Sequence, residues 1–214
     1  MPAVHGILDE LLERRPDLKC MAAEIKNAFA LTADAYQNGC KLLLCGNGGS
    51  AADAEHIAGE LMKGFLKKRP LDSALKQRLA EIGGALGENI ANMLQKGLPA
   101  VSLVSQTALG TAVVNDIGGE MIFAQQINAL GKQGDVLWAL STSGNSPNVV
   151  AAAIAAKALD MHVVALTGAG GGKLKSYADT VLKAPYTGTH LIQEAHLPIY
   201  HALCAMLEAK FFTE

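Results

Sequence analysis

The chain has 214 residues, of which 50% are hydrophobic and 18% are charged, and its formal net charge is −2. This length suits one α/β domain with a sizeable core, and the composition excludes an intrinsically disordered chain. The absence of a basic excess and an aromatic content of 5% argue against a nucleic-acid partner. No apolar run is long enough to span a membrane, and the amphipathic, charged N-terminus lacks a signal-peptide core, so we expect a cytoplasmic protein with no membrane partner.

Short hydrophobic runs alternate with helical patterns along the chain. The helical patterns lie at 17–38, 50–64, 106–131 (with a break near 115–119), 146–159, 171–177 and 191–212. Five runs between them are nearly continuous in hydrophobicity, as expected for strands covered on both faces, and they lie at 41–45, 100–105, 135–141, 162–167 and 179–184. This alternation predicts an α/β fold, a doubly wound, five-stranded parallel sheet flanked by helices, in a single domain over 1–214.

The first predicted strand runs into a glycine-rich turn. Residues 45–60 read CGNGGSAADAEHIAGE. A turn of this kind, before a helix, presents free backbone N–H groups and the positive end of the helix dipole, which favours an anion such as phosphate. His56 and Glu60 follow four residues apart and therefore share one helix face. The combination indicates an enzyme that acts on a small phosphorylated substrate, because a carboxylate there can take a proton from a carbon next to a carbonyl.

Residues 66–98 do not fit the alternation. The segment from Pro70 to Ser73 resembles a helix start, and the residues after it resemble a helical arm interrupted by Gly83 and Gly84. We interpret this stretch as a helical insertion between the first helix of the sheet unit and the second strand. A cap over the active site, a role in assembly and a solvated surface helix all remain open.

A second polar loop follows the third predicted strand. Residues 141–146 read STSGNS and precede Pro147 and a helical pattern. The hydroxyl groups can donate to phosphate oxygens, and Ser146 can cap the helix. Because the C-terminal ends of parallel strands meet at one edge of a sheet, we expect this loop to lie beside the loop at 46–50 and to form a phosphate site with it. The glycine-rich loop at 167–173 has neither a Walker A pattern nor GxGxxG spacing, and we interpret it as a turn.

The last helical pattern carries further candidate residues. Gln193 and His201 are eight residues apart, which is about 80° around an ideal helix, so both can face one cleft. Pro198 predicts a kink or the true start of this helix. With His56 and Glu60, these residues offer two imidazoles, a carboxylate and an amide oxygen, which are plausible ligands for a divalent metal. Taken singly, each side chain also fits a structural role.

Three segments resemble the signature segments of the phosphoheptose isomerases, a family with the sugar isomerase (SIS) phosphosugar-binding fold. They read CGNGGSAADAEHIAGEL, STSGNS and IQEAHLPIYHALC. The resemblance covers roughly residues 20–212, except the insertion. It implies an aldose–ketose isomerase that converts sedoheptulose 7-phosphate to D-glycero-D-manno-heptose 7-phosphate through an enediol, at the start of nucleotide-activated heptose synthesis. It also implies a homotetramer with active sites at subunit interfaces and one bound zinc per subunit.

The resemblance assigns roles to individual residues. Glu60 matches the general base and His201 the general acid. The implied metal ligands are His56, Glu60, Gln193 and His201. The predicted substrate-binding residues are Asn47, Gly48, Ser50, Asn115, Asp116, Ser141, Thr142, Ser143, Ser146 and Gln193.

This chain departs from the family pattern at several positions. Gln106 stands where many members have an acidic residue that contacts the sugar, and Leu191 stands where many have Arg. A basic residue that often follows the first helix is shifted here, and the candidates for it are Lys63, Lys67, Lys68 and Arg69. The exact sugar phosphate is therefore left open.

Other functions also remain open. Some SIS proteins of this shape bind the replication initiator DnaA as non-catalytic tetramers, but the presence of both Glu60 and His201 argues against that role. A sugar-phosphate-sensing domain of a regulator would be expected to accompany a DNA-binding segment, which we do not find in this sequence. An isomerase for another sugar phosphate is a further alternative.

Overall fold

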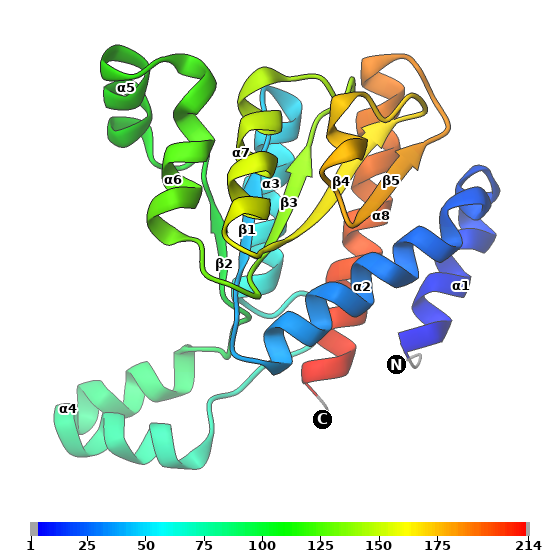
Figure 1. The fold of residues 1–214 in the computed structure, drawn as a ribbon. Coiled ribbons are helices and arrows are strands. Elements are labelled where there is room, and N and C mark those ends of the chain that lie inside the picture. Colours follow the sequence, from blue (N-terminus) through cyan, green and yellow to red (C-terminus); the bar gives the residue numbers. More distant parts are fainter. Residues whose placement is uncertain (1–3, 213–214) are drawn as a thin grey trace.

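A five-stranded parallel sheet forms the centre of the molecule in the computed structural model, which describes residues 4–212 (Figure 1). The strands are β1 (Leu42–Cys45), β2 (Ala100–Ser102), β3 (Val136–Leu140), β4 (His162–Gly168) and β5 (Thr180–Ala184). Their order is β2-β1-β3-β4-β5, and all neighbouring pairs are parallel. The predicted doubly wound sheet is confirmed. Because the strand order reverses direction at β1, the loops after β1 and β3 flank the switch point, where such sheets bind ligands.

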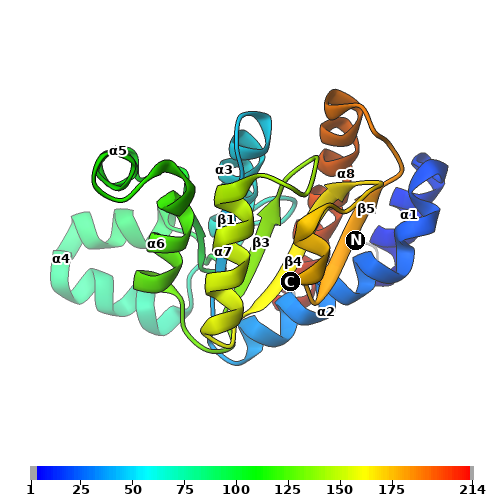
Figure 2. The ribbon, with the colours of Figure 1, turned by 45° about the horizontal axis from the view of Figure 1, so that its top comes forward.

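Helices cover both faces of the sheet (Figures 1 and 2). One face packs against α1 (Val4–Arg14), α2 (Ala22–Gln37), α3 (Gly49–Met62) and α8 (Thr189–Phe211), and the other against α6 (Ile122–Leu130) and α7 (Pro147–Ala158). Alternate strand residues serve the two cores: Leu42 and Leu44 belong to the first, Leu43 and Cys45 to the second. No described helix is both long enough and apolar enough to cross a membrane.

Further helices lie in the segments between these elements. They are α4 (Ser73–Met93), α5 (Thr107–Asp116) and the short 3-10 helices η1 (Pro16–Met21), η2 (Gly119–Met121) and η3 (Lys173–Ser176). The predicted helix at 17–38 is therefore divided into η1 and α2, after Pro16. The break expected near 115–119 separates α5 from α6, as predicted.

Helix α8 differs from its prediction. It runs without interruption through Pro198, so this proline does not mark its start. Proline cannot donate the helical hydrogen bond to the carbonyl four residues earlier, which is that of Glu194. Here the Glu194 carbonyl accepts a bond of 3.5 Å from Arg15 Nη1 instead. Helices α1, α2 and α3 pack on α8 within the chain, so most of its apolar surface is already covered.

The insertion forms a helical hairpin that projects away from the sheet, at the end opposite the loops that follow the strands (Figure 1). The two arms of α4 meet at Gly84, whose φ of 54° and ψ of −134° lie outside the helical region, so the predicted interruption is confirmed. The arms are close: a Cβ at Gly87 would lie 1.9 Å from the Leu79 carbonyl oxygen. Ile82 and Met93 on this hairpin are 78% and 72% exposed. The hairpin does not cap the loops of its own chain.

Candidate active site

A cavity of about 370 Å³ lies at the C-terminal ends of β1 and β3. Its walls come from the two predicted loops and from the start of α8. The lining residues are Asn47, Gly48, Gly49, Ser50, Leu140, Ser141, Thr142, Ser146, Thr189 and Gln193. The structure thus brings together seven of the predicted substrate-binding residues. Thr189 was not predicted, although its place at the first turn of α8 is the kind of position at which a hydroxyl often lies beside an anion.

The glycine-rich turn after β1 depends on its glycines. Gly48 has a φ of 55°, which is unfavourable for residues with a Cβ. Gly49 begins α3, and a Cβ there would lie 2.6 Å from Gln193 Nε2, so the absence of a side chain lets α8 approach. The turn therefore brings the N-terminus of α3 to the cavity. The N–H groups of Ser50 and Ala51 donate to the carbonyls of Asn47 and Gly48, whereas the Gly49 N–H has no backbone acceptor and is available to an anion.

The loop after β3 forms the opposite wall. The hydroxyl groups of Ser141 and Ser146 lie 2.9 Å apart, and both line the cavity. Ser143 is different, because its Oγ accepts the Asn145 backbone N–H at 3.1 Å and it is not part of the lining. The loop at 167–173 braces this wall through backbone bonds, among them Gly168 N–H to the Thr142 carbonyl at 2.9 Å. The interpretation of that loop as a turn agrees with this arrangement.

The two cavity loops are also joined directly. The side-chain amides of Asn47 and Asn148 each donate to the other's oxygen at 2.9 Å. Asn148 was not predicted, and the signal that could have indicated it is its position in the first turn of the helix after STSGNS.

A cluster of titratable residues lies farther along α3, where α3 and α8 pack together. His56 Nε2 is 3.0 Å from Glu60 Oε1, and the His56 and His201 rings stand edge to face with centroids 5.0 Å apart. Lys63 Nζ lies 3.3 Å from the second Glu60 oxygen. The predicted base and acid thus occupy one cluster, beside His56.

The surroundings of His201 favour its neutral imidazole form. Burial lowers its pKa, and the neighbouring His56 lowers it further, against an opposing effect of Glu60. Its Nε2 is buried and has no hydrogen-bond partner. A neutral imidazole can donate a proton from one nitrogen and accept one at the other, which suits transfer between two oxygens.

Two further residues extend this cluster into the protein. The Tyr200 hydroxyl lies 3.0 Å from His56 Nδ1 and 3.1 Å from Asp53 Oδ1. The contacts Asp53–Tyr200, Tyr200–His56 and His56–Glu60 need three hydrogens, of which the tyrosine and a neutral imidazole supply two. The third must come from protonation of one further group in the chain of contacts, and burial raises the pKa of Asp53. Asp53, His56 and Glu60 share one helix face at spacings of three and four, and this spacing is a sequence signal for Asp53.

Gln193 does not join His201, contrary to the prediction that both face one cleft. Gln193 lines the loop cavity, whereas His201 lines a separate cavity of about 510 Å³ near Phe65 and Glu208. Eight residues of helix rise about 12 Å, and the angular argument ignored this axial separation.

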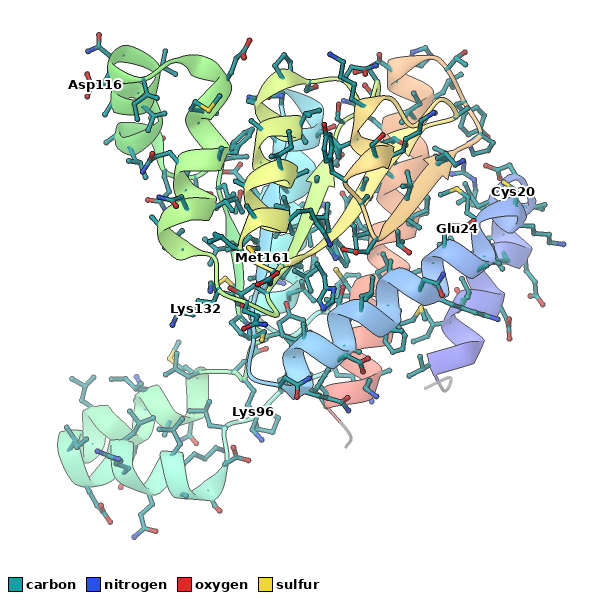
Figure 3. The ribbon with its side chains drawn as sticks, viewed as in Figure 1. Cys20, Glu24, Lys96, Asp116, Lys132 and Met161 are labelled. Atoms are coloured by element: carbon teal, nitrogen blue, oxygen red, sulfur yellow. The ribbon has the colours of Figure 1, made fainter. Side chains whose placement is uncertain are left out.

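Asn115 and Asp116 lie elsewhere. Asn115 lines a third cavity, of about 630 Å³, together with Gln106, and its amide donates to Asp116 at 2.8 Å. Asp116 lies at the end of α5, well away from α3 and α8 (Figure 3). The structure does not bring these two residues to the loop cavity of their own chain.

One candidate basic residue has a structural role. Arg69 is 1% exposed, and its Nε donates to Glu208 Oε1 at 2.8 Å while its Nη1 donates to the Leu61 carbonyl at 2.7 Å. It is therefore not available to a substrate in this arrangement, whereas Lys63 and Lys68 are exposed.

The donor chemistry at the cluster fits a zinc ion in part. Two imidazoles and a carboxylate are typical zinc ligands, and the unpartnered Nε2 of His201 offers a buried donor beside His56. Within residues 4–212, however, no three His, Cys, Asp or Glu side chains are already arranged around a common point suitable for a metal. His56 Nδ1 and Nε2 both have other contacts.

Comparisons with known proteins find similarity to the SIS domain and to phosphoheptose isomerases. The SIS domain model matches residues 9–85 and 79–168. A phosphoheptose isomerase of Burkholderia pseudomallei is 41% identical over 196 residues, which cover 92% of this chain and 86% of that protein. The structure of a phosphoheptose isomerase from Neisseria gonorrhoeae aligns with a TM-score of 0.72 at 35% identity, covering 96% of both chains. One from Francisella tularensis aligns with a TM-score of 0.75 at 30% identity, covering 95% of both.

Proposed function

Since this chain belongs to the phosphoheptose isomerase family of SIS-domain proteins, we propose that it interconverts sedoheptulose 7-phosphate and D-glycero-D-manno-heptose 7-phosphate. The observation that carries the proposal is the placement of two features on one helix. Helix α3 has the hydroxyl-lined cavity at its N-terminus and Glu60 toward its other end, about 15 Å along the axis from Ser50. An elongated sugar phosphate suits such a separation between its phosphate and its reacting carbons.

The cavity between the loops receives the terminal phosphate in this proposal. Ser141 and Ser146 provide hydroxyl donors there, Thr189 provides a third, and the start of α3 provides a backbone N–H group. Neutral donors at a helix N-terminus can hold phosphate without an arginine. A phosphate site without an arginine agrees with the structure, in which Arg69 is bound to Glu208.

Glu60 and His201 carry out the proton transfers. Glu60 removes a proton from C1 of the ketose and returns it to C2 of the enediol. His201 moves the second proton, giving one to the oxygen on C2 and taking one from the oxygen on C1. The electron pair of the broken C1–H bond forms the enediol double bond and then the new C2–H bond, so the reaction needs no oxidant or reductant.

We also propose that a zinc ion belongs to the active enzyme. His56, Glu60 and His201 would hold it, with His56 Nε2 facing the ion in place of its contact with Glu60 Oε1. Gln193 would join them only after its side chain leaves the loop cavity. When bound, zinc supplies Lewis-acid polarisation of the sugar oxygens. The support is the donor chemistry of the cluster and the unpartnered nitrogen of His201.

The assembly proposed is a homotetramer in the cytoplasm. Its support comes from exposed apolar side chains on α4 and α5, such as Leu86 at 67% and Ile117 at the end of α5 at 58%, and not from α8, which is largely covered within the chain. Asn115 and Asp116 can contact substrate only in the cavity of a neighbouring subunit. Sedimentation coupled to an activity assay tests this, and a fully active monomer would contradict it.

The activity itself is tested by NMR. Incubating the protein with sedoheptulose 7-phosphate in D₂O is expected to produce the signals of a new aldose with deuterium at C2, because a proton held on Glu60 exchanges with solvent. A product without deuterium would argue for a transfer shielded from solvent or for hydride transfer. If no aldose forms and a different ketose phosphate reacts, the enzyme is an isomerase for another sugar phosphate.

A further inference from the structure

We propose that Tyr200 and Asp53 are positioning residues for the isomerase reaction. The Tyr200 hydroxyl, itself held by Asp53, sets the orientation of the His56 imidazole and so fixes the position of Nε2, the nitrogen that faces Glu60. This inference rests on the proposed function, in which Glu60 is the general base. Neither Tyr200 nor Asp53 lines the loop cavity.

The contacts of His56 leave its ring little freedom. Nδ1 lies 3.0 Å from the Tyr200 hydroxyl, and Nε2 lies 3.0 Å from Glu60 Oε1. An imidazole has no other polar atoms, so rotation of the ring breaks both contacts. The position of the Glu60 carboxylate is therefore linked to the position of the Tyr200 hydroxyl.

Burial holds the Tyr200 side chain in one position. Its side chain is fully buried, with 0% exposed, whereas the His56 side chain is 42% exposed. The Tyr200 ring stands edge to face with both His56 and His201, at centroid distances of 5.6 Å and 5.0 Å. The ordered core of the protein thus orients a side chain that faces solvent, as supporting residues do in preorganised sites.

Asp53 destabilises the fold through one of its carboxylate oxygens, so a contribution to stability does not explain its presence. Its Oδ1 accepts the Tyr200 hydroxyl at 3.1 Å, but its Oδ2 is buried and has no hydrogen-bond partner. A buried polar atom without a partner is destabilising. We attribute the presence of Asp53 to its effect on Tyr200, because the carboxylate accepts the hydroxyl hydrogen and so holds the tyrosine oxygen in place beside His56 Nδ1.

The inference predicts a specific kinetic effect. Tyr200→Phe keeps the ring packing and removes only the hydroxyl, which leaves His56 free to rotate and Glu60 without a fixed neighbour. We expect kcat for sedoheptulose 7-phosphate to fall about tenfold or more, since small misplacements of a catalytic group are costly. KM should stay within about twofold, because other residues form the phosphate cavity.

A matched control separates positioning from stability. Tyr36 is another buried tyrosine, and its hydroxyl donates to the Pro99 carbonyl at 3.3 Å, away from His56 and Glu60. Tyr36→Phe should lower thermal stability to a similar degree and leave kcat unchanged. Equal kcat losses in the two variants would overturn the inference, because the Tyr200 effect would then be general loosening of the core.

Asp53→Ala provides the second arm. If Asp53 acts through Tyr200, Asp53→Ala should lower kcat, and the double variant with Tyr200→Phe should lose no more than Tyr200→Phe alone. If the kcat losses of the two single variants multiply in the double variant, the proposed coupling between Asp53 and Tyr200 is overturned. Should Tyr200→Phe fail to fold, an unchanged kcat in Asp53→Ala overturns the inference. A wild-type chain that does not turn over the substrate refutes the proposed function, whereas an active wild type with unaltered kcat in Tyr200→Phe refutes only this inference.

Discussion

Asn47 and Asn148 exchange two hydrogen bonds of 2.9 Å each through their side-chain amides. Asn47 belongs to the glycine-rich turn after β1, and Asn148 belongs to the first turn of α7, after the second loop. Their positions in the chain are 101 residues apart. The pair therefore fixes the spacing between the two walls of the loop cavity.

Asn148→Ala should weaken substrate binding without removing a group that contacts the phosphate. Loss of a hydrogen-bonded pair is worth about 1 kcal/mol, so KM should rise about fivefold while kcat changes little. Steady-state kinetics with sedoheptulose 7-phosphate measure both constants. Asn38→Ala serves as the control, because the Asn38 amide caps the end of α2 by donating to the Asp34 carbonyl. A similar KM in the Asn148 variant and the wild type would show that the pair does not shape the cavity.

The serines of the second loop should differ in their effects on binding. Ser146→Ala removes a hydroxyl that lines the cavity, and we expect KM to rise by about fivefold to tenfold, with a smaller effect on kcat. Ser143→Ala removes a hydroxyl that does not line the cavity, so its KM should stay within about twofold of the wild-type value. If Ser143→Ala raises KM more than Ser146→Ala does, the phosphate binds elsewhere on the loop.

The acid and base assignment predicts large losses of turnover in folded proteins. Glu60→Gln and His201→Ala should each lower kcat by about 10²–10⁴-fold, the usual effect of removing a positioned acid or base. Circular dichroism checks that each variant is folded. Lys157→Ala is the control, since Lys157 pairs with Asp179 at 2.8 Å and does not belong to the cluster. Near-normal turnover in Glu60→Gln would exclude Glu60 as the base.

The buried ion pair between Arg69 and Glu208 should make stability depend on pH in the acidic range. Burial alone would raise the pKa of Glu208, but the backbone N–H groups of Phe65 and Leu66 and the Arg69 guanidinium lower it below its ordinary value of 4.5. The unfolded chain thus binds this proton more readily than the folded one. The contribution of Glu208 is complete above about pH 4.5 and is lost as the pH falls through the lowered value.

Glu208→Gln should cost about 3–5 kcal/mol of unfolding free energy at neutral pH, because Arg69 would remain buried without its counter-charge. Urea unfolding at a series of pH values measures both effects. The difference in stability between wild type and variant should shrink as the pH falls below 4.5. A constant difference across this range would mean that Glu208 is not the titrating group.

Zinc should co-purify with the protein if the metal proposal is correct. Elemental analysis after gentle purification should give about one zinc per chain, and His56→Gln should lower that content. His190→Gln is a suitable control, because His190 is exposed and does not belong to the cluster. A zinc-free preparation with full activity would contradict the proposal.

The strands, the glycine-rich turn and part of the candidate site could be predicted from local features of the sequence. Nearly continuous hydrophobic runs at strand length predicted the five strands, because strands of a covered parallel sheet are buried on both faces. The turn at 46–50 follows from glycines that alone tolerate its backbone, and the shared face of His56 and Glu60 follows from helical periodicity. These are consequences of neighbouring residues, so the sequence expresses them directly.

Only the tertiary structure decided how the helices meet. Tyr200 reaches Asp53 across 147 positions of the chain, and no local pattern specifies that contact. The separation of Gln193 from His201, the burial of Arg69 against Glu208 and the helix that continues through Pro198 likewise depend on what packs beside α8. Such contacts depend on how apolar surface is buried across the whole core. Many residues contribute to that burial, so it cannot be predicted from any one segment of the sequence.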